Sequence, residues 1–263
     1  MMHKIARRAR RVNIIGWLVV VATIALWQLV VGTGLAGSEY LPAPDEVVAA
    51  LGDLVSSGQL QQDVLHTTNV TLISSAIACL VGVSLGLTIA LVPLFNRFFS
   101  ASFDLLRTVP VIALMPVALL IWGPQAKTEI IVATYGAIWP ILINTAGGVR
   151  AVQPRLHEVA RMFRFSRAKT LRRIILPAAL PDIVVGARLA VVTALVLAII
   201  AEMLVNAQGL GWGLVTTQQA LQPAQMWGYA IVCGVMGYFL NLILIQAARR
   251  SLPGSAAFAD SER

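Results

Sequence analysis

Few residues of this chain have the types and spacing that catalysis requires. The sequence contains no G-x-x-x-x-G-K-[ST] phosphate loop and no H-E-x-x-H zinc-protease motif. Its three histidines, His3, His66 and His157, fall in a tail and two predicted loops, so no predicted membrane span contains one. The two cysteines, Cys79 and Cys233, lie in apolar runs and form no CxxC motif. The sequence therefore predicts a non-enzymatic chain without a metal or cofactor of its own.

Three polar residues inside apolar runs are candidates for a solute pathway or gate: Glu202, Asn144 and Asn241. Glu202 is the only charged residue between 189 and 248, and a carboxylate at that depth is costly unless it faces a cavity or a partner. A structural hydrogen bond from Glu202 to the loop 206–213 is an equal alternative. The two asparagines also fit a role in joining helices, and Arg188 fits a side chain that extends toward the inner membrane face.

The composition predicts a membrane protein. Of 263 residues, 58% are hydrophobic and only 12% are charged, about half the charged fraction of soluble chains. Apolar runs of about 20 residues are long enough to cross the bilayer as helices. Six such spans are predicted, near residues 14–35, 67–94, 105–123, 130–149, 183–205 and 226–248. The first is too long for a cleaved signal peptide and is interpreted as a retained span.

Basic residues predict the orientation of these spans. Of the 20 Lys and Arg residues, 17 fall in residues 1–13, at 97, between 150 and 173, or at 249, 250 and 263. Because cytoplasmic loops carry the basic excess, both termini are predicted to be cytoplasmic. The expected organisation is a basic N-terminus (1–13), a transmembrane domain (14–250) with a cytoplasmic loop at 150–181, and a tail (251–263). The net charge of +8 thus reflects topology, and nucleic acid is not an expected partner.

The loop between spans four and five has helical periodicity. An apolar stripe recurs at spacings of three and four residues: Leu156, Val159, Ala160 and Phe163. Ser166 is a predicted N-cap of a second helix, which Pro177 is expected to stop. On pattern alone, a basic amphipathic helix lying on anionic lipid explains the stretch equally well.

The same loop resembles the signature of permease subunits of bacterial ATP-binding-cassette importers, whose motif runs E-A-A, three residues, G, nine residues, I-x-L-P. Glu158, Val159 and Ala160 occupy its first three positions, and Ile174-Ile-Leu-Pro177 ends it at the family spacing. Further matching pieces are similar to the nitrate, sulfonate and taurine subfamily: Leu41-Pro-Ala-Pro44, Arg107-Thr-Val-Pro110, Trp139-Pro-Ile-Leu-Ile-Asn-Thr145, Ala201-Glu-Met203 and Gly209-Leu-Gly211.

Two positions depart from the motif. Val159 replaces its first alanine, which is a conservative change, and Arg164 stands at the glycine position. If the backbone there needs a positive φ, a residue other than glycine costs about 1 to 2 kcal/mol. The turn at Arg164 then either differs from that of the family or tolerates strain.

The resemblance implies an all-α permease of six transmembrane helices in the bacterial inner membrane. Two ATPase subunits, which bind ATP and Mg, would dock on the loop through Glu158, Val159, Ala160, Phe163, Arg164 and Ser166. A second permease subunit, expected to be another copy of this chain, would complete the pathway. An external binding protein would deliver a small solute such as a sulfonate, taurine or a nitrate-like anion. The principal alternative is an ion-coupled secondary carrier. Such carriers usually contain inverted repeats, and this sequence shows no clear internal repeat. A structural scaffold is a further alternative, but it would not need the loop motif.

Overall fold

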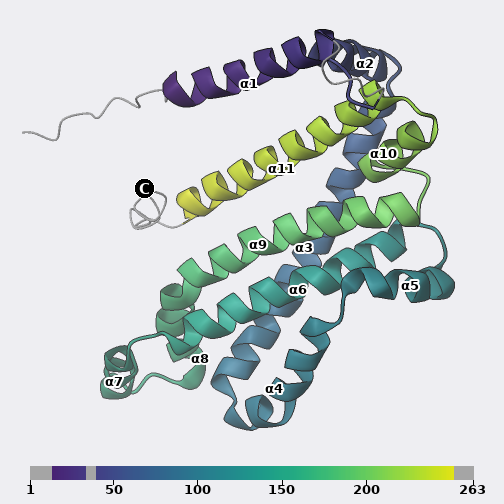
Figure 1. Ribbon diagram of the computed structural model, residues 1–263. Coiled ribbons are helices and arrows are strands. Elements are labelled where there is room, and N and C mark those ends of the chain that lie inside the picture. The colour runs from purple at the N-terminus through teal and green to yellow at the C-terminus, as the bar shows by residue number, and fades with distance from the viewer. Residues whose placement is uncertain (1–13, 34–39, 252–263) are drawn as a thin grey trace, which may run out of the picture.

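The computed structural model describes residues 14–33 and 40–251, and every regular element in these ranges is a helix (Figure 1). The α-helices are α1 (Ile14–Gly32), α2 (Pro44–Ser56), α3 (Gln59–Leu91), α4 (Pro93–Thr108), α5 (Met115–Trp122), α6 (Ala126–Arg150), α7 (Pro154–Met162), α8 (Arg167–Thr170), α9 (Leu176–Leu204), α10 (Leu210–Gln219) and α11 (Pro223–Ser251). A 3-10 helix, η1 (Val111–Leu114), precedes α5, and a π-helix, η2 (Leu171–Ile175), joins α8 to α9. The predicted N-terminus (1–13) and all of the predicted tail (251–263) except Ser251 lie outside the described residues.

Four helical segments are long and apolar enough to cross a membrane: α3, α6, the continuous run from α8 through α9, and α11. The bent pair formed by α4 and η1–α5 would make a fifth span, and α1 is a shorter apolar helix. The predicted all-α membrane fold is therefore confirmed. α3 begins at Gln59, several residues before the start predicted for the second span, so its first turns contain polar residues that were predicted to lie in a loop.

The centre of the fold is the packing of α6 between α3 and α9. Small residues line these contacts, including the buried Ala78, Ala137, Ala190 and Ala194 around Ile141. Gly82 and Gly86 of α3 face α6 so closely that a Cβ at either position would lie within 3.0 Å of α6 atoms. Small residues let helix backbones approach in lipid, where van der Waals packing drives association.

The span predicted over residues 105–123 contains a sharp break. α4 and the η1–α5 segment are bent by 86° relative to each other. Val109 has an extended backbone (φ −65°, ψ 121°), as expected for a residue that precedes proline. Pro110 also lacks the N–H that would continue the α4 ladder, so the helix ends before it.

Pro177 does not end a helix, and that prediction was wrong. The chain runs without interruption from Arg167 to Leu204. In the π-turn before the proline, the Leu176 N–H donates to the Leu171 carbonyl, one residue further back than in an α-helix. This wider turn brings Pro177 into the first turn of α9, where its missing N–H is tolerated.

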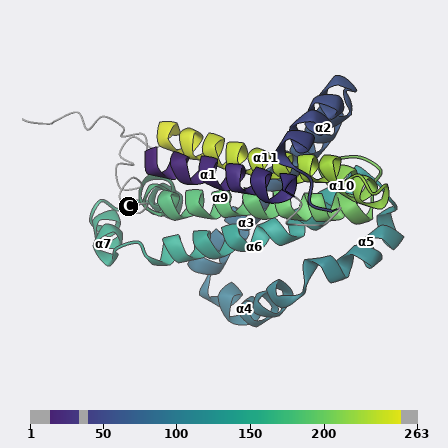
Figure 2. The same ribbon diagram turned by 45° about the horizontal axis from the view of Figure 1, so that its top comes forward.

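The helices define two ends of the bundle. α7 and α8 lie at one end, together with the start of α1 and the end of α11, whereas α5 and α10 lie at the other (Figures 1 and 2). α2 projects from the bundle near the α10 end (Figure 2). α1 contacts α2, and its Trp27 ring lies 5.5 Å from that of Trp227 on α11.

Candidate functional site

The α10 end of the bundle holds a buried polar cluster built around the start of α10. The first N–H groups of a helix have no partner within the helix and need acceptors from elsewhere. Side chains of α3 and α9 accept from three successive N–H groups: Asp63 Oδ1 from Gly209 (3.1 Å), Thr67 Oγ1 from Leu210 (3.0 Å) and Glu202 Oε2 from Gly211 (2.9 Å). These contacts fix α10 onto two of the central helices.

The Gly209-Leu-Gly211 sequence is required by this close approach. Gly209 has a φ of +96°, a conformation that residues with side chains rarely adopt, and a Cβ there would lie 2.3 Å from the Glu202 carboxyl carbon. A Cβ on Gly211 would lie 2.1 Å from the carbonyl oxygen of Ile199. Only glycine fits at either position without moving α10.

Glu202 is fully buried and makes the structural hydrogen bond to the 206–213 loop that the sequence analysis considered. Its Oε2 atom also accepts from the hydroxyl of Thr67 (3.0 Å). Asp63 is held in a similar way, since its Oδ2 accepts from the hydroxyl of Tyr229 on α11 (2.8 Å). Glu202 therefore belongs to a network that joins α3, α9, α10 and α11.

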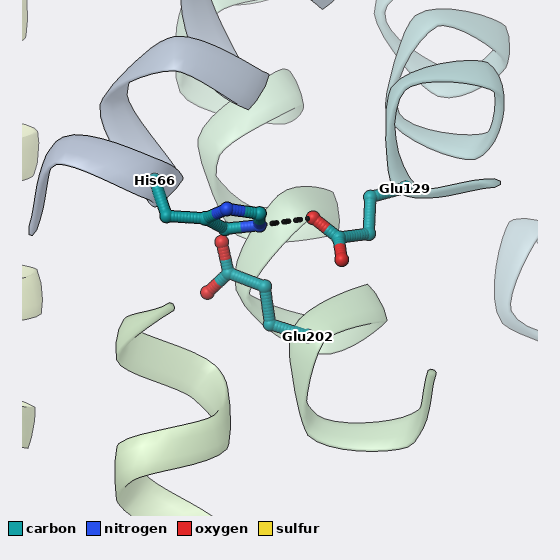
Figure 3. A group of neighbouring side chains, drawn as sticks. All are labelled: His66, Glu129 and Glu202. Carbon is teal, nitrogen blue, oxygen red and sulfur yellow. Dashed lines mark hydrogen bonds and ion pairs between the residues drawn. The ribbon is translucent and has the colours of Figure 1, made fainter. Parts of the chain in front are cut away.

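Beside this network, His66 Nε2 of α3 lies within hydrogen-bond distance of Glu129 Oε2 of α6, at 2.8 Å (Figure 3). The prediction that His66 lies in a loop was wrong, and sequence reasoning missed both partners. Asp63, His66 and Thr67 lie three and four residues apart, which places them on one helix face. That spacing could have indicated a polar face on α3, but no local signal links it to Glu129, which lies 63 residues further along the chain.

The two asparagines predicted as pathway residues do not join this cluster. Asn144 lies 15 residues beyond Glu129 on α6, about 22 Å along the helix, and its amide donates to its own helix at the Pro140 carbonyl (2.7 Å). Asn241 of α11 accepts from Arg188 Nε of α9 at 2.6 Å. This pair lines a groove of about 500 Å³ between α9 and α11.

The opposite end carries the predicted coupling loop. α7 ends at Met162, and the Phe165 N–H then donates to the Ala160 carbonyl (2.9 Å), which closes the turn. Arg164, at the motif glycine position, has a φ of +49°, so the turn does need the left-handed conformation and strain is tolerated. Ser166 caps α8 by accepting from the Lys169 N–H (3.3 Å), as predicted.

The apolar residues of this loop do not share one face. Ala160 is only 4% exposed and packs toward its own chain, in a groove that Pro93, Phe165 and Ile175 also line. The exposed apolar face contains the other three residues of the predicted stripe, together with Met162, which the prediction did not include. Their exposed fractions are 37% for Leu156, 40% for Val159, 69% for Phe163 and 81% for Met162; Glu158 is exposed as well.

This helical arrangement is the fold of the membrane subunits of ATP-binding-cassette transporters. The chain matches a subunit in the structure titled "Inward facing conformations of the MetNI methionine ABC transporter" with a TM-score of 0.65 at 20% sequence identity, over 75% of this chain and 98% of that one. The shared feature at this level of identity is the fold.

Sequence comparison gives the family. Residues 78–254 match the model of the binding-protein-dependent transport system inner membrane component, and the chain belongs to this family. It is 31% identical to a putative aliphatic sulfonates transport permease protein of Bacillus subtilis, over 84% of this chain and 80% of the relative. It is 33% identical to a bicarbonate transport system permease protein of Synechococcus elongatus, over 63% and 60%. The predicted permease class and inner-membrane location are confirmed, and the family is a transport component.

Proposed function

We propose that this chain forms the translocation pathway of an importer for a small oxyanion, and that partner ATPase subunits drive it through α7 and the turn that follows. The observation that carries the proposal is the exposed apolar face of α7, which includes Met162 and Phe163 at 81% and 69% exposure. An apolar face of this kind on a short helix with basic flanks is suited to a groove on a protein partner.

The connections of α7 suit transmission of force. Ala160 seats the helix against its own chain, and the continuous run from Arg167 to Leu204 begins directly after the Ser166 cap. A displacement of α7 by a docked ATPase would therefore move α9 as a rigid element. Glu158 would lie at the rim of the contact, and Arg164 would hold the turn in its left-handed conformation.

The proposed topology has six membrane spans, of which α1 forms one and the bent α4–α5 pair forms another. Three observations support it: the 17 basic residues on the proposed inner side, the apolar character of α1, and the common end of the bundle shared by α7, the start of α1 and the end of α11 (Figure 1). In this orientation α7 is cytoplasmic, whereas α10 and α2 are external.

The partners follow from the family and from these surfaces. Two ATPase subunits that bind ATP and Mg would dock at α7, a second copy of the chain would complete the pathway, and an external binding protein would deliver the solute near α2. The solute would be a small oxyanion, because the relatives carry names for sulfonates and bicarbonate. Asn241, which holds the cationic Arg188 in a groove of α9 and α11, is the pathway residue best suited to an anion.

A charge placed on the apolar face of α7 tests the coupling proposal. Phe163→Asp should release the ATPase subunits during purification, because an unpaired charge in an apolar contact costs about 3 kcal/mol, which weakens binding more than about a hundredfold. Val48→Asp is the matched control, since Val48 is an equally exposed residue (68%) on α2 at the other end of the bundle. Normal ATPase recovery with Phe163→Asp would overturn the docking site and favour a helix that lies on lipid.

A further inference from the structure

The cluster of His66, Glu129 and Glu202 has the donor set of a metal site. One ligand atom from each residue lies within 4.8 Å of the others. The three side chains come from α3, α6 and α9 and point toward one another (Figure 3). Glu129 and Glu202 are fully buried, whereas the His66 side chain is 15% exposed and is the most accessible of the three.

Two oxygens of this cluster have unmet bonding capacity. Among the described residues, Glu129 Oε1 and Glu202 Oε1 are buried and have no hydrogen-bond partner. Buried carboxylate oxygens are costly unless they are hydrogen-bonded, protonated or bound to a metal. His66 bonds to the other oxygen of Glu129, and the other oxygen of Glu202 accepts from Thr67 and Gly211, so one oxygen of each acid remains for a ligand.

The charges also favour a cation. The cluster sets two carboxylates against a single imidazole, and protonation of that imidazole would balance one of them. A divalent ion balances both and leaves the imidazole neutral, which is the form that ligates metals. A ligand set of one histidine nitrogen and two carboxylate oxygens, which leaves a fourth position for water, suits zinc and similar first-row ions.

Metal binding would require the three ligand atoms, which lie within 4.8 Å of one another, to adjust their separations. Ligand atoms about 2.0 to 2.1 Å from a tetrahedral zinc ion lie about 3.3 Å apart. His66 Nε2 and Glu129 Oε2 are 2.8 Å apart, so these two atoms would separate slightly as the metal replaces the proton between them. The Glu202 Oε2 atom can stay on Gly211 and Thr67 while its Oε1 atom ligates.

We propose that His66, Glu129 and Glu202 bind one divalent transition-metal ion of the zinc class, contrary to the expectation from sequence that the chain holds no metal. The ion would join α3, α6 and α9 beside the start of α10. It would thus brace the end of the bundle at which α10 is held. This inference does not depend on the solute or on the coupling loop.

Zinc binding to the purified complex of the full chain with its ATPase subunits tests the site. After chelation and dialysis, the complex is titrated with zinc chloride, and bound metal is measured by mass spectrometry and by competition with a chelating dye. We expect one zinc ion per chain. His66→Gln and Glu129→Gln should each lower the affinity at least about tenfold, whereas His157→Gln, on α7, should bind as the wild type does.

A second readout covers the case in which Glu129→Gln fails to fold. Zinc should raise the thermal unfolding temperature of the wild type and of His157→Gln but not of His66→Gln, whose side chain is the most exposed of the three. Absence of zinc binding by the wild type, or equal retention of zinc by His66→Gln, would overturn the proposal. Either result would leave the permease assignment and the α7 docking site unaffected, because neither measurement depends on transport.

Discussion

Removal of the Glu202 side chain should loosen α10 from the bundle. Glu202→Ala deletes the acceptor for the Gly211 N–H (2.9 Å) and the Thr67 hydroxyl (3.0 Å) in a fully buried setting. A buried donor without a partner costs about 1 to 3 kcal/mol, and two donors lose their acceptor here. We expect a loss of about 3 kcal/mol in the free energy of local opening. Glu202→Gln keeps an acceptor oxygen and should lose about 1 kcal/mol.

Amide hydrogen exchange measures this effect where it occurs. A loss of 3 kcal/mol should reduce protection of the first α10 amides by about a hundredfold in Glu202→Ala, and by about fivefold in Glu202→Gln. Asp182→Ala, which removes an exposed acid of the same helix α9, is the control and should leave α10 protection unchanged. Protection within about twofold of the wild type in Glu202→Ala would refute the capping role.

Three further predictions concern other parts of the chain. Gly86→Ala should lower the thermal unfolding temperature, because its Cβ would lie 2.8 Å from an α6 carbonyl oxygen. In Gly147→Ala the new Cβ meets nothing within 4 Å, so this control should be neutral or stabilising. Equal unfolding temperatures for the two variants would contradict the close α3–α6 packing. Arg164→Gly should stabilise the turn after α7 by about 1 kcal/mol, visible as slower local exchange, since it relieves a φ of +49°. Single cysteines at the exposed positions Ser57 and Ser166 should react with impermeant reagents from outside and inside respectively, and labelling from one side would rule out the proposed topology.

The long apolar helices could be predicted from sequence because length and the absence of charge are local properties. The predicted spans 130–149, 183–205 and 226–248 overlap α6, α9 and α11, and most of their ends agree with the helix ends within a few residues. The interruption at Pro110 was less visible, because the residues around it are as apolar as those of a continuous span. At Pro177 the sequence predicted a helix end that the structure does not have. A π-turn accommodates the proline, and that turn depends on the geometry of several preceding residues.

Features of the candidate sites could be predicted from sequence only where all the residues that form them lie in one short segment. The Ser166 cap and the strained turn at Arg164 are local and could be anticipated from the motif spacing. The inward orientation of Ala160 depends on packing against α4 and the π-turn, which periodicity does not describe. The contact of His66 with Glu129 unites helices distant in sequence, so it emerges only from the tertiary structure.

ATP-driven uptake is the most direct test of the central claim that this chain is the permease of an importer. The chain and its ATPase subunits are reconstituted in liposomes, and uptake of a labelled sulfonate or bicarbonate is measured with the binding protein on the side of α10. We predict uptake that requires ATP on the side of α7, stops with Phe163→Asp, and is unaffected when ionophores remove ion gradients. Uptake that proceeds without ATP and ceases with the ion gradient would contradict the account and identify a secondary carrier.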